Sequence, residues 1–221
     1  MSLAPTTLLE EQILSGGAVT VAGVDEVGRG ALAGPVTVGV CVIDRGKLVE
    51  PFPAELRDSK LISRQIRERL VEPLQEWAVD YAVGHASPAE IDEIGITAAL
   101  RLAWTRALAD LRTPPSAVIL DGKHNWLTPP SGHLFDDGHE VALPVTMKIK
   151  ADVHCASVAA ASVLAKVARD HVMREAHERF PEFGFASNVG YGSSGHMTAM
   201  RRFGITEIHR KSWNLPTRDK A

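Results

Sequence analysis

Short apolar runs alternate with amphipathic segments along this chain of 221 residues. β-branched apolar runs bounded by glycine, proline or charge predict buried strands, whereas apolar positions three and four residues apart predict helices. Helical patterns begin at Ser63 and Ser87, break at Gly95, resume over 97–111 and are longest over 153–180, and residues 1–17 indicate a short helix or a loose arm. The predicted strands cover residues 19–24, 35–43, 77–85, 117–120 and 141–147.

Several local signals support these assignments. Ser63 is expected to cap its helix, and Ser87 with Pro88 and Glu90 predicts a capping box. Small residues at helical spacing in the first half of 153–180 allow that helix to approach a sheet closely. Interleaved strands and helices predict an α/β layered domain with a short helical annex after about residue 184.

Composition narrows the class of protein. No apolar stretch approaches the roughly 18 to 20 residues that cross a bilayer, and no basic segment followed by an apolar core opens the chain. The two cysteines, Cys41 and Cys155, lie in separate apolar runs and are expected to be buried free thiols. A cytoplasmic protein with no membrane association is therefore expected.

Charge is distributed unevenly along the chain. Residues 186–221 contain six basic and two acidic residues and carry +4, which leaves −7 for the rest because the whole chain carries −3. An acidic body that holds cations, beside a basic surface that holds phosphates, suits a metal-dependent enzyme acting on a polyanion. A solvated charged tail explains the same numbers, so charge alone leaves both readings open.

Four acids stand out by their positions. Asp25 and Glu26 follow the first strand, Asp121 ends the short apolar strand 117–120, and Asp152 precedes the longest helix. Carboxylates suit Mg²⁺ or Mn²⁺, and a pair of such ions about 4 Å apart can cleave a phosphodiester. Successive strand residues point to opposite faces, so Asp25 and Glu26 can share one cluster only if the strand ends or bulges there. A single acid of this kind is more often a cap or a solvated residue, and it is the four positions together that make a metal site an equal alternative.

Candidate phosphate and sugar contacts lie in glycine-rich or basic segments. Glycines expose backbone N–H groups, arginine can bind phosphate through two bonds, and a tyrosine between glycines can stack on a sugar or base. A hairpin turn and a packed tyrosine remain the structural alternatives. The nine histidines lack the spacing of a zinc site and are assigned no metal. The candidates are Gly28, Arg29, Gly30, Ser59, Lys60, Lys150 and Tyr191.

The ordered set of motifs closely resembles ribonuclease HII from about residue 19 to residue 213. The matching segments are VAGVDEVGRGALAGPV at 21–36, DSK at 58–60, LDG at 120–122, KAD at 150–152, SVAAASVLAKVARD at 157–170 and GYG at 190–192. The resemblance implies a ribonuclease H-like α/β fold with a mixed central sheet flanked by helices over 1–184, and a basic helical extension over 185–221 packed on it. It also implies a metal-dependent endonuclease that cuts RNA in RNA–DNA hybrids and at single ribonucleotides in duplex DNA.

The resemblance also implies roles for particular residues. The family's acidic tetrad falls on Asp25, Glu26, Asp121 and Asp152, as both catalytic groups and ligands of two Mg²⁺ or Mn²⁺ ions. Residues 28–30 would read the ribose 2′-OH and the adjoining phosphate, and Tyr191 would stack on the deoxyribose that follows the ribonucleotide. The chain departs from the family pattern at Lys123, in the long polar loop 123–140 and at residues 193–195. These departures bear on the contacts with the substrate and not on the metal site.

Two rival functions remain at this stage. One is a junction resolvase-like or integrase-like nuclease on the same fold, and the other is a catalytically silent nucleic-acid binding module whose acids are structural. The preferred hypothesis is a monomeric cytoplasmic endoribonuclease that cuts on the 5′ side of a ribonucleotide and leaves 3′-hydroxyl and 5′-phosphate ends.

Overall fold

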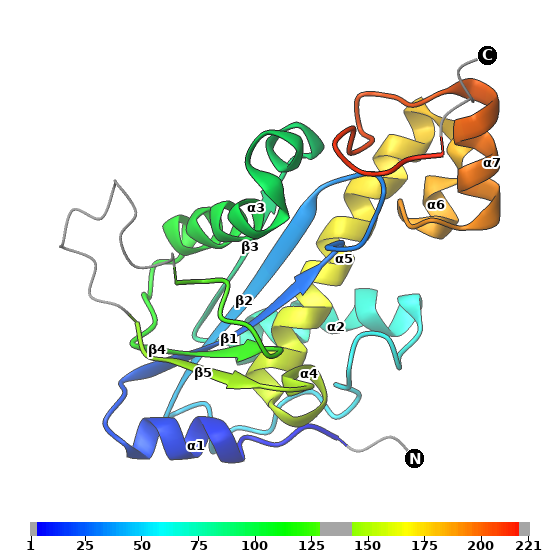
Figure 1. Ribbon diagram of the computed structural model, residues 1–221. Coiled ribbons are helices and arrows are strands. Elements are labelled where there is room, and N and C mark those ends of the chain that lie inside the picture. Colours follow the sequence, from blue (N-terminus) through cyan, green and yellow to red (C-terminus); the bar gives the residue numbers. More distant parts are fainter. Residues whose placement is uncertain (1–3, 129–142, 217–221) are drawn as a thin grey trace.

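A five-stranded mixed sheet forms the centre of the protein in the computed structural model, which describes residues 4–128 and 143–216 (Figure 1). Its strand order is β3-β2-β1-β4-β5. β2 runs antiparallel to β1 and β3, whereas β4 runs parallel to β1 and β5. The strands are β1 (Thr20–Val27), β2 (Val36–Asp44), β3 (Asp80–Ala86), β4 (Ala117–Asp121) and β5 (Val145–Lys148).

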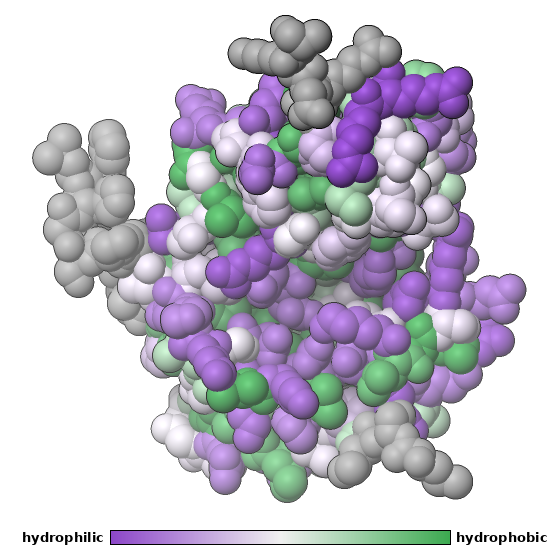
Figure 2. Space-filling model, turned by 45° about the vertical axis from the view of Figure 1, so that its right-hand side comes forward, coloured by the Kyte–Doolittle hydropathy of each residue, from purple (hydrophilic) through white to green (hydrophobic). Residues whose placement is uncertain are grey.

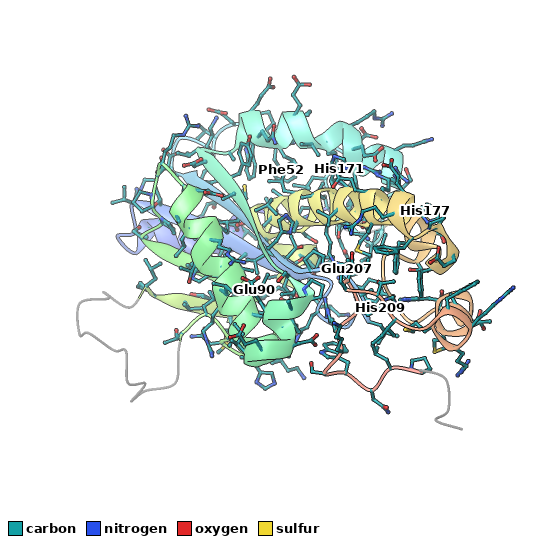
Figure 3. All side chains as sticks on the ribbon, turned by 90° about the horizontal axis from the view of Figure 1, so that it is seen from above. Phe52, Glu90, His171, His177, Glu207 and His209 are labelled. Atoms are coloured by element: carbon teal, nitrogen blue, oxygen red, sulfur yellow. The ribbon has the colours of Figure 1, made fainter. Side chains whose placement is uncertain are left out.

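Helices cover both faces of this sheet (Figures 1 and 3). One face packs on α3, and the opposite face packs on α5 together with α1 and α2. The predicted α/β class with a mixed sheet flanked by helices is therefore confirmed. The helices are α1 (Leu8–Ser15), α2 (Arg64–Trp77), α3 (Pro88–Asp110), α4 (Ala151–His154), α5 (Ala156–Arg179), the 3-10 turn η1 (Pro181–Phe183), α6 (Phe185–Asn188) and α7 (Ser194–Phe203).

Glycines in the sheet let α5 lie directly on the strands. A Cβ atom on Gly23 would come within 2.2 Å of the Ser157 backbone, and one on Gly39 within 2.2 Å of the Ala161 carbonyl oxygen. The small residues predicted on this helix are buried against the sheet, as expected. Small groups on both partners therefore bring the α5 backbone close to β1 and β2.

Several local predictions are confirmed. The Ser63 side chain accepts a hydrogen bond from the N–H of Ile66 and caps α2. Ser87 and Glu90 form the predicted capping box, and Gly95, at φ +77°, interrupts α3. Cys41 and the other cysteine are free and buried.

Other boundaries differ from prediction because tertiary contacts override the local pattern. Residue 77 ends α2 instead of starting a strand, since Trp77 packs edge-on against Phe52. The helix predicted over 153–180 is interrupted at Cys155, which has extended backbone angles. β5 begins at Val145, and most of the loop predicted over 123–140 lies outside the described residues.

The N-terminal segment explains the interruption at Cys155. The N–H of Thr6 donates to the His154 carbonyl, and the N–H of Ala156 donates to the Thr6 carbonyl, so the segment pairs with the extended residue between α4 and α5. Oε1 of the fully buried Glu10 accepts hydrogen bonds from the N–H and hydroxyl of Ser157, at 2.9 and 2.8 Å. Glu10 thus caps α5 from another helix, where negative charge is favourable.

The C-terminal helices pack on the far half of α5. Met173 and Ala176 join Phe183, Phe185 and Met200 in one apolar cluster. No helix within 4–128 or 143–216 is both long and apolar enough to cross a bilayer. The proposed division of the chain at residue 184 stays a prediction.

Two fully buried histidines stand beside this cluster, and Figure 3 shows His209 between the end of the sheet and the C-terminal helices. The N–H of Thr206 donates to Nδ1 of His209, so the proton of neutral His209 is on Nε2. That nitrogen lies 3.1 Å from Nε2 of His196 and donates to it, which leaves the His196 proton on Nδ1, 2.9 Å from the Tyr191 carbonyl oxygen. The pair therefore links Thr206 to Tyr191 through neutral rings.

Replacing Glu10 tests the cap on α5. Glu10→Ala removes both bonds to Ser157 and leaves buried polar groups without a partner, so it should lower the free energy of unfolding by about 1–3 kcal/mol. Glu10→Gln retains an acceptor oxygen and should cost less. Urea unfolding of the three proteins measures the difference, and wild-type stability of Glu10→Ala would refute the cap.

Stability should also depend on the protonation of His209. Burial, with a contribution from His196, lowers the pKa of His209 from 6.5 to about 4. Between these values the unfolded chain binds a proton that the folded chain does not, so this contribution to stability is complete above pH 6.5 and is lost as pH falls toward 4. The urea midpoints of wild type and His209→Gln, compared from pH 7 to 4.5, isolate the contribution of His209. The carboxylates are the same in both proteins, so their titration affects both alike. The variant should show the shallower pH dependence, and equal slopes would contradict the assignment.

Candidate functional site

Parallel pairing of β1 and β4 brings the first acids together. Val24 pairs with Leu120 in this register, so Asp25 and Asp121, the next residues of each strand, lie at the same edge of the sheet. The carboxyl ends of parallel strands are where α/β sheets place their binding groups. Two residues that are 96 positions apart in the sequence thus become neighbours.

The side chain of Glu26 projects from the opposite face of β1 to that of Asp25. The expectation that β1 ends or bulges at the acids is wrong, because it stays paired with β2 as far as Val27 and Thr37. Asp25 is buried on the face covered by α5, and Glu26, one residue on, lies on the face covered by α3. The strand's pleat therefore separates the two carboxylates, and Asp121 lies close enough to interact with both.

Asp152 reaches the same edge from α4. Its Oδ2 atom lies 3.0 Å from Nζ of Lys60 in an ion pair, and its side chain is nearly fully buried. The N–H of Ala151, the first residue of α4, donates to Oδ1 of Asp121 at 2.6 Å. The start of α4 thus ties Asp121 to the segment that carries Asp152.

The electrostatics of these acids, hereafter the four-carboxylate group (Asp25, Glu26, Asp121 and Asp152), reflect burial and mutual repulsion. Burial raises the pKa of Asp25 to about 7, and repulsion from the other three carboxylates adds to the rise while a hydrogen bond from Ser162 opposes it. Burial is also the largest cause that raises the pKa of Glu26 and of Asp121. Positive charge placed here would relieve both costs.

The group is not a preformed metal cage. Within the described parts of the chain, no three acidic, histidine or cysteine side chains converge closely enough to hold an ion. Asp152 pairs with Lys60, and Glu26 pairs with Arg29 at 3.4 Å. A divalent cation would therefore compete with these two side chains. The donor set itself, all carboxylate oxygens, fits Mg²⁺ or Mn²⁺ and not a soft metal.

The loop that follows β1 uses its glycines differently. Gly28 has φ +81°, and a Cβ atom there would lie 2.1 Å from Nε of the buried Arg169. Gly30 has no heavy atom within 4 Å of a Cβ position, so the protein itself does not require glycine there. Arg29 between them is exposed. Gly28 is thus needed for packing, whereas Gly30 leaves open space at the surface.

The remaining predicted contacts are distributed around this edge. Ser59 is buried, and its hydroxyl bonds that of Ser162, a residue that lowers the pKa of Asp25, so Ser59 contacts the acids only through Ser162. Lys60 and Lys150 are exposed, and Lys150 has the left-handed φ of +57° at the start of α4. Tyr191 is 38% exposed. On the face in Figure 2, hydrophilic residues predominate across the middle of the molecule, below the C-terminal helices.

Two buried arginines were not singled out from the sequence. Arg169 and Arg210 are both fully buried. Among residues 4–128 and 143–216, their side chains donate hydrogen bonds to backbone carbonyls alone, in the loop after β1 and at residue 189. Arg169 also lies over the Tyr191 ring, at 5.6 Å from its centre. The position of Arg169 within an apolar helix was a signal in the sequence that its side chain is buried. Arg210 gave no such signal, because the basic residues near it in the sequence are exposed.

Comparison with known proteins identifies the family of this chain. The sequence profile of the family described as Ribonuclease HII matches residues 22–215. The chain is 49% identical over 210 residues to ribonuclease HII of Streptomyces avermitilis, covering 95% of this chain and 83% of that protein. It is 42% identical over 204 residues to ribonuclease HII of Desulfitobacterium hafniense, covering 92% of this chain and 72% of that protein.

Solved structures share the fold. The crystal structure of ribonuclease H2 from Pyrococcus horikoshii OT3 superposes with a TM-score of 0.72 at 30% identity, over 90% of this chain and 95% of that one. RNase HII of Archaeoglobus fulgidus, solved in complex with PCNA, gives a TM-score of 0.68 at 25% identity, over 92% and 98%. The family expected from the motifs is thereby confirmed, and this chain belongs to the ribonuclease HII family of ribonuclease H endonucleases.

Proposed function

We propose that this chain hydrolyses the RNA strand of RNA–DNA hybrids and cuts on the 5′ side of single ribonucleotides in duplex DNA. The products carry 3′-hydroxyl and 5′-phosphate ends. The observation that carries the proposal is the position of Asp25, Asp121 and Asp152 at one edge of the sheet, beside a loop with exposed backbone donors. The chain is proposed to act as a monomer in the cytoplasm.

The four-carboxylate group is the proposed holder of two Mg²⁺ or Mn²⁺ ions. Asp25 and Asp121 are the central candidates because the parallel pairing of β1 with β4 brings them to one edge of the sheet. Glu26 would complete the set from the opposite face of β1, through its proximity to Asp121, and Asp152 would complete it from α4. When bound, such a pair of ions activates a water molecule and stabilises the leaving oxygen. An RNase HIII structure with the same fold, at 18% identity and a TM-score of 0.64, is described as a complex with Mn²⁺.

The surrounding residues would orient the substrate. Arg29 is exposed and can exchange its Glu26 partner for a phosphate, and Lys60 and Lys150 supply further positive charge. Tyr191 presents an exposed ring that can stack on the deoxyribose after the ribonucleotide. Gly30 leaves room for the ribose and its phosphate to approach the backbone. These contacts would distinguish RNA from DNA through the 2′-OH.

Cleavage of defined duplexes tests the reaction and the acids together. Duplexes with one, four or no ribonucleotides, incubated with Mg²⁺ or Mn²⁺, should be cut only where ribonucleotides occur. Asp121 is a proposed metal ligand, and loss of even an outer-shell partner of a metal costs about 10–100-fold, so Asp121→Asn should lower the rate about 100-fold or more while duplex binding is retained. Asp110→Asn is the matched control at an exposed carboxylate and should leave the rate unchanged. Cutting of branched DNA instead would support a resolvase, and binding without any cleavage would support a silent module.

A pair of glycine variants tests how the loop receives the substrate. Gly30→Ala should fold with wild-type stability but bind a duplex containing one ribonucleotide about tenfold more weakly, because the methyl group fills space that the substrate needs. Gly28→Ala should instead lower Tm, since its Cβ meets Arg169. Thermal unfolding and duplex affinity in the Asp121→Asn background separate the effects. Unchanged affinity of Gly30→Ala would remove that position from the binding site.

A further inference from the structure

Arg210 holds the loop after β1 from within the protein. Its Nη2 atom donates to the carbonyl of Gly28 at 2.6 Å and its Nη1 atom to that of Arg29 at 2.9 Å. Nε and Nη2 also reach the Gly34 carbonyl at 3.1 Å. The side chain is fully buried and pairs with no carboxylate among the described residues. The guanidinium also lies over the Trp213 ring, at 4.9 Å from its centre, but all of its hydrogen bonds to described residues go to the loop backbone.

These bonds set the direction of two peptide groups. A trans peptide points its C=O and its N–H in opposite directions, and the described chain has no cis peptide bond. The carbonyls of Gly28 and Arg29 point inward to Arg210, so the N–H groups of the same two peptides, on Arg29 and Gly30, point outward. Neither N–H has an acceptor in the parts of the chain that the structure describes, and both residues are exposed.

The same bonds strengthen the outward donors. A carbonyl that accepts from a charged group polarises its peptide, which makes the attached N–H a better donor. Arg169 repeats the pattern beside it by donating to the carbonyls of Ala33 and Val189. Two guanidinium charges that form no ion pair with any residue the structure describes thus lie behind the loop, on the side away from the substrate.

We propose that Arg210 is a positioning residue for substrate recognition. It keeps the N–H groups of Arg29 and Gly30 turned outward and polarised, so that they bind the oxygen atoms of the ribonucleotide and its phosphate without any contact between Arg210 and the substrate. This inference rests on the proposed function. Lysine cannot replace it, because the rigid fork of arginine donates to three carbonyls at once and an ammonium group does not.

Affinity and its salt dependence distinguish this role from a direct phosphate contact. In the Asp121→Asn background, Arg210→Lys and Arg210→Gln should each weaken binding to a duplex with one ribonucleotide about tenfold or more, with less effect on an all-DNA duplex of the same sequence. The slope of log Kd against log salt should stay unchanged, whereas Arg29→Ala should lower it by about one. A reduced slope for the Arg210 variants would overturn the positioning role.

A stability control separates positioning from general support of the fold. Leu74→Ala in α2 removes a buried side chain away from the loop and lowers stability, but it should leave the preference for the ribonucleotide unchanged. Equal loss of preference in Leu74→Ala and Arg210→Lys would overturn the inference. If wild type distinguishes the two duplexes and both Arg210 variants distinguish them equally well, this inference alone fails. If wild type does not distinguish or cut them, the proposed function fails with it.

A measurement on the unaltered loop keeps the inference testable if the Arg210 variants do not fold. In ¹⁵N-labelled Asp121→Asn protein, the amide signals of Arg29 and Gly30 should shift on addition of the ribonucleotide duplex, and more than on addition of the all-DNA duplex. Their hydrogen exchange should be fast in the free protein and slower in the complex. Amide signals that do not respond to the duplex would overturn the proposed direction of these N–H groups.

Discussion

The parallel pairing of β1 with β4 is the constraint on which the site depends. It places Asp25 and Asp121 at one edge because Val24 and Leu120 are partners, and a shift by one residue would turn every side chain of one strand to the opposite face. The register is held by burial on both faces, with Val24 packed toward α3 and Ile119 packed toward α5. The carboxylates are thus brought together by the packing of apolar residues, against their own repulsion.

Opposite charges lie close to one another along β1 and the loop after it. β1 carries two carboxylates, Asp25 and Glu26, whose pKa values are raised by burial. Behind the loop that follows lie Arg169 and Arg210, whose hydrogen bonds to other described residues all go to backbone carbonyls. Burial lowers the pKa of Arg210 to about 10, so it remains charged at neutral pH. The carboxylates of β1 and the guanidinium groups of these two arginines do not form ion pairs with one another. A substrate that carries phosphates and is accompanied by divalent cations would complement both.

The ends of the chain support this arrangement from two sides. At the N-terminal side, Thr6 pairs with Cys155 and Glu10 caps α5, which separates α4 from α5 and sets the position of Asp152. At the C-terminal side, Arg210 and the histidine pair connect the loop after β1 with the backbone at Tyr191. The candidate site is therefore built from segments that are far apart in the sequence but share a few buried polar contacts.

The local features of this protein could be predicted from its amino-acid sequence. Apolar runs, the capping box at Ser87 and the break at Gly95 follow from short-range chemistry, and the motifs around Asp25 and Asp121 identified the family. Three features became visible only in the folded chain: Asp25 and Glu26 leave opposite faces of an unbroken strand, Cys155 interrupts a helix, and Arg210 turns inward to bond carbonyls. Each of these depends on partners distant in the chain, such as Thr6 for Cys155, and residue spacing along a sequence carries no information about which distant groups will meet.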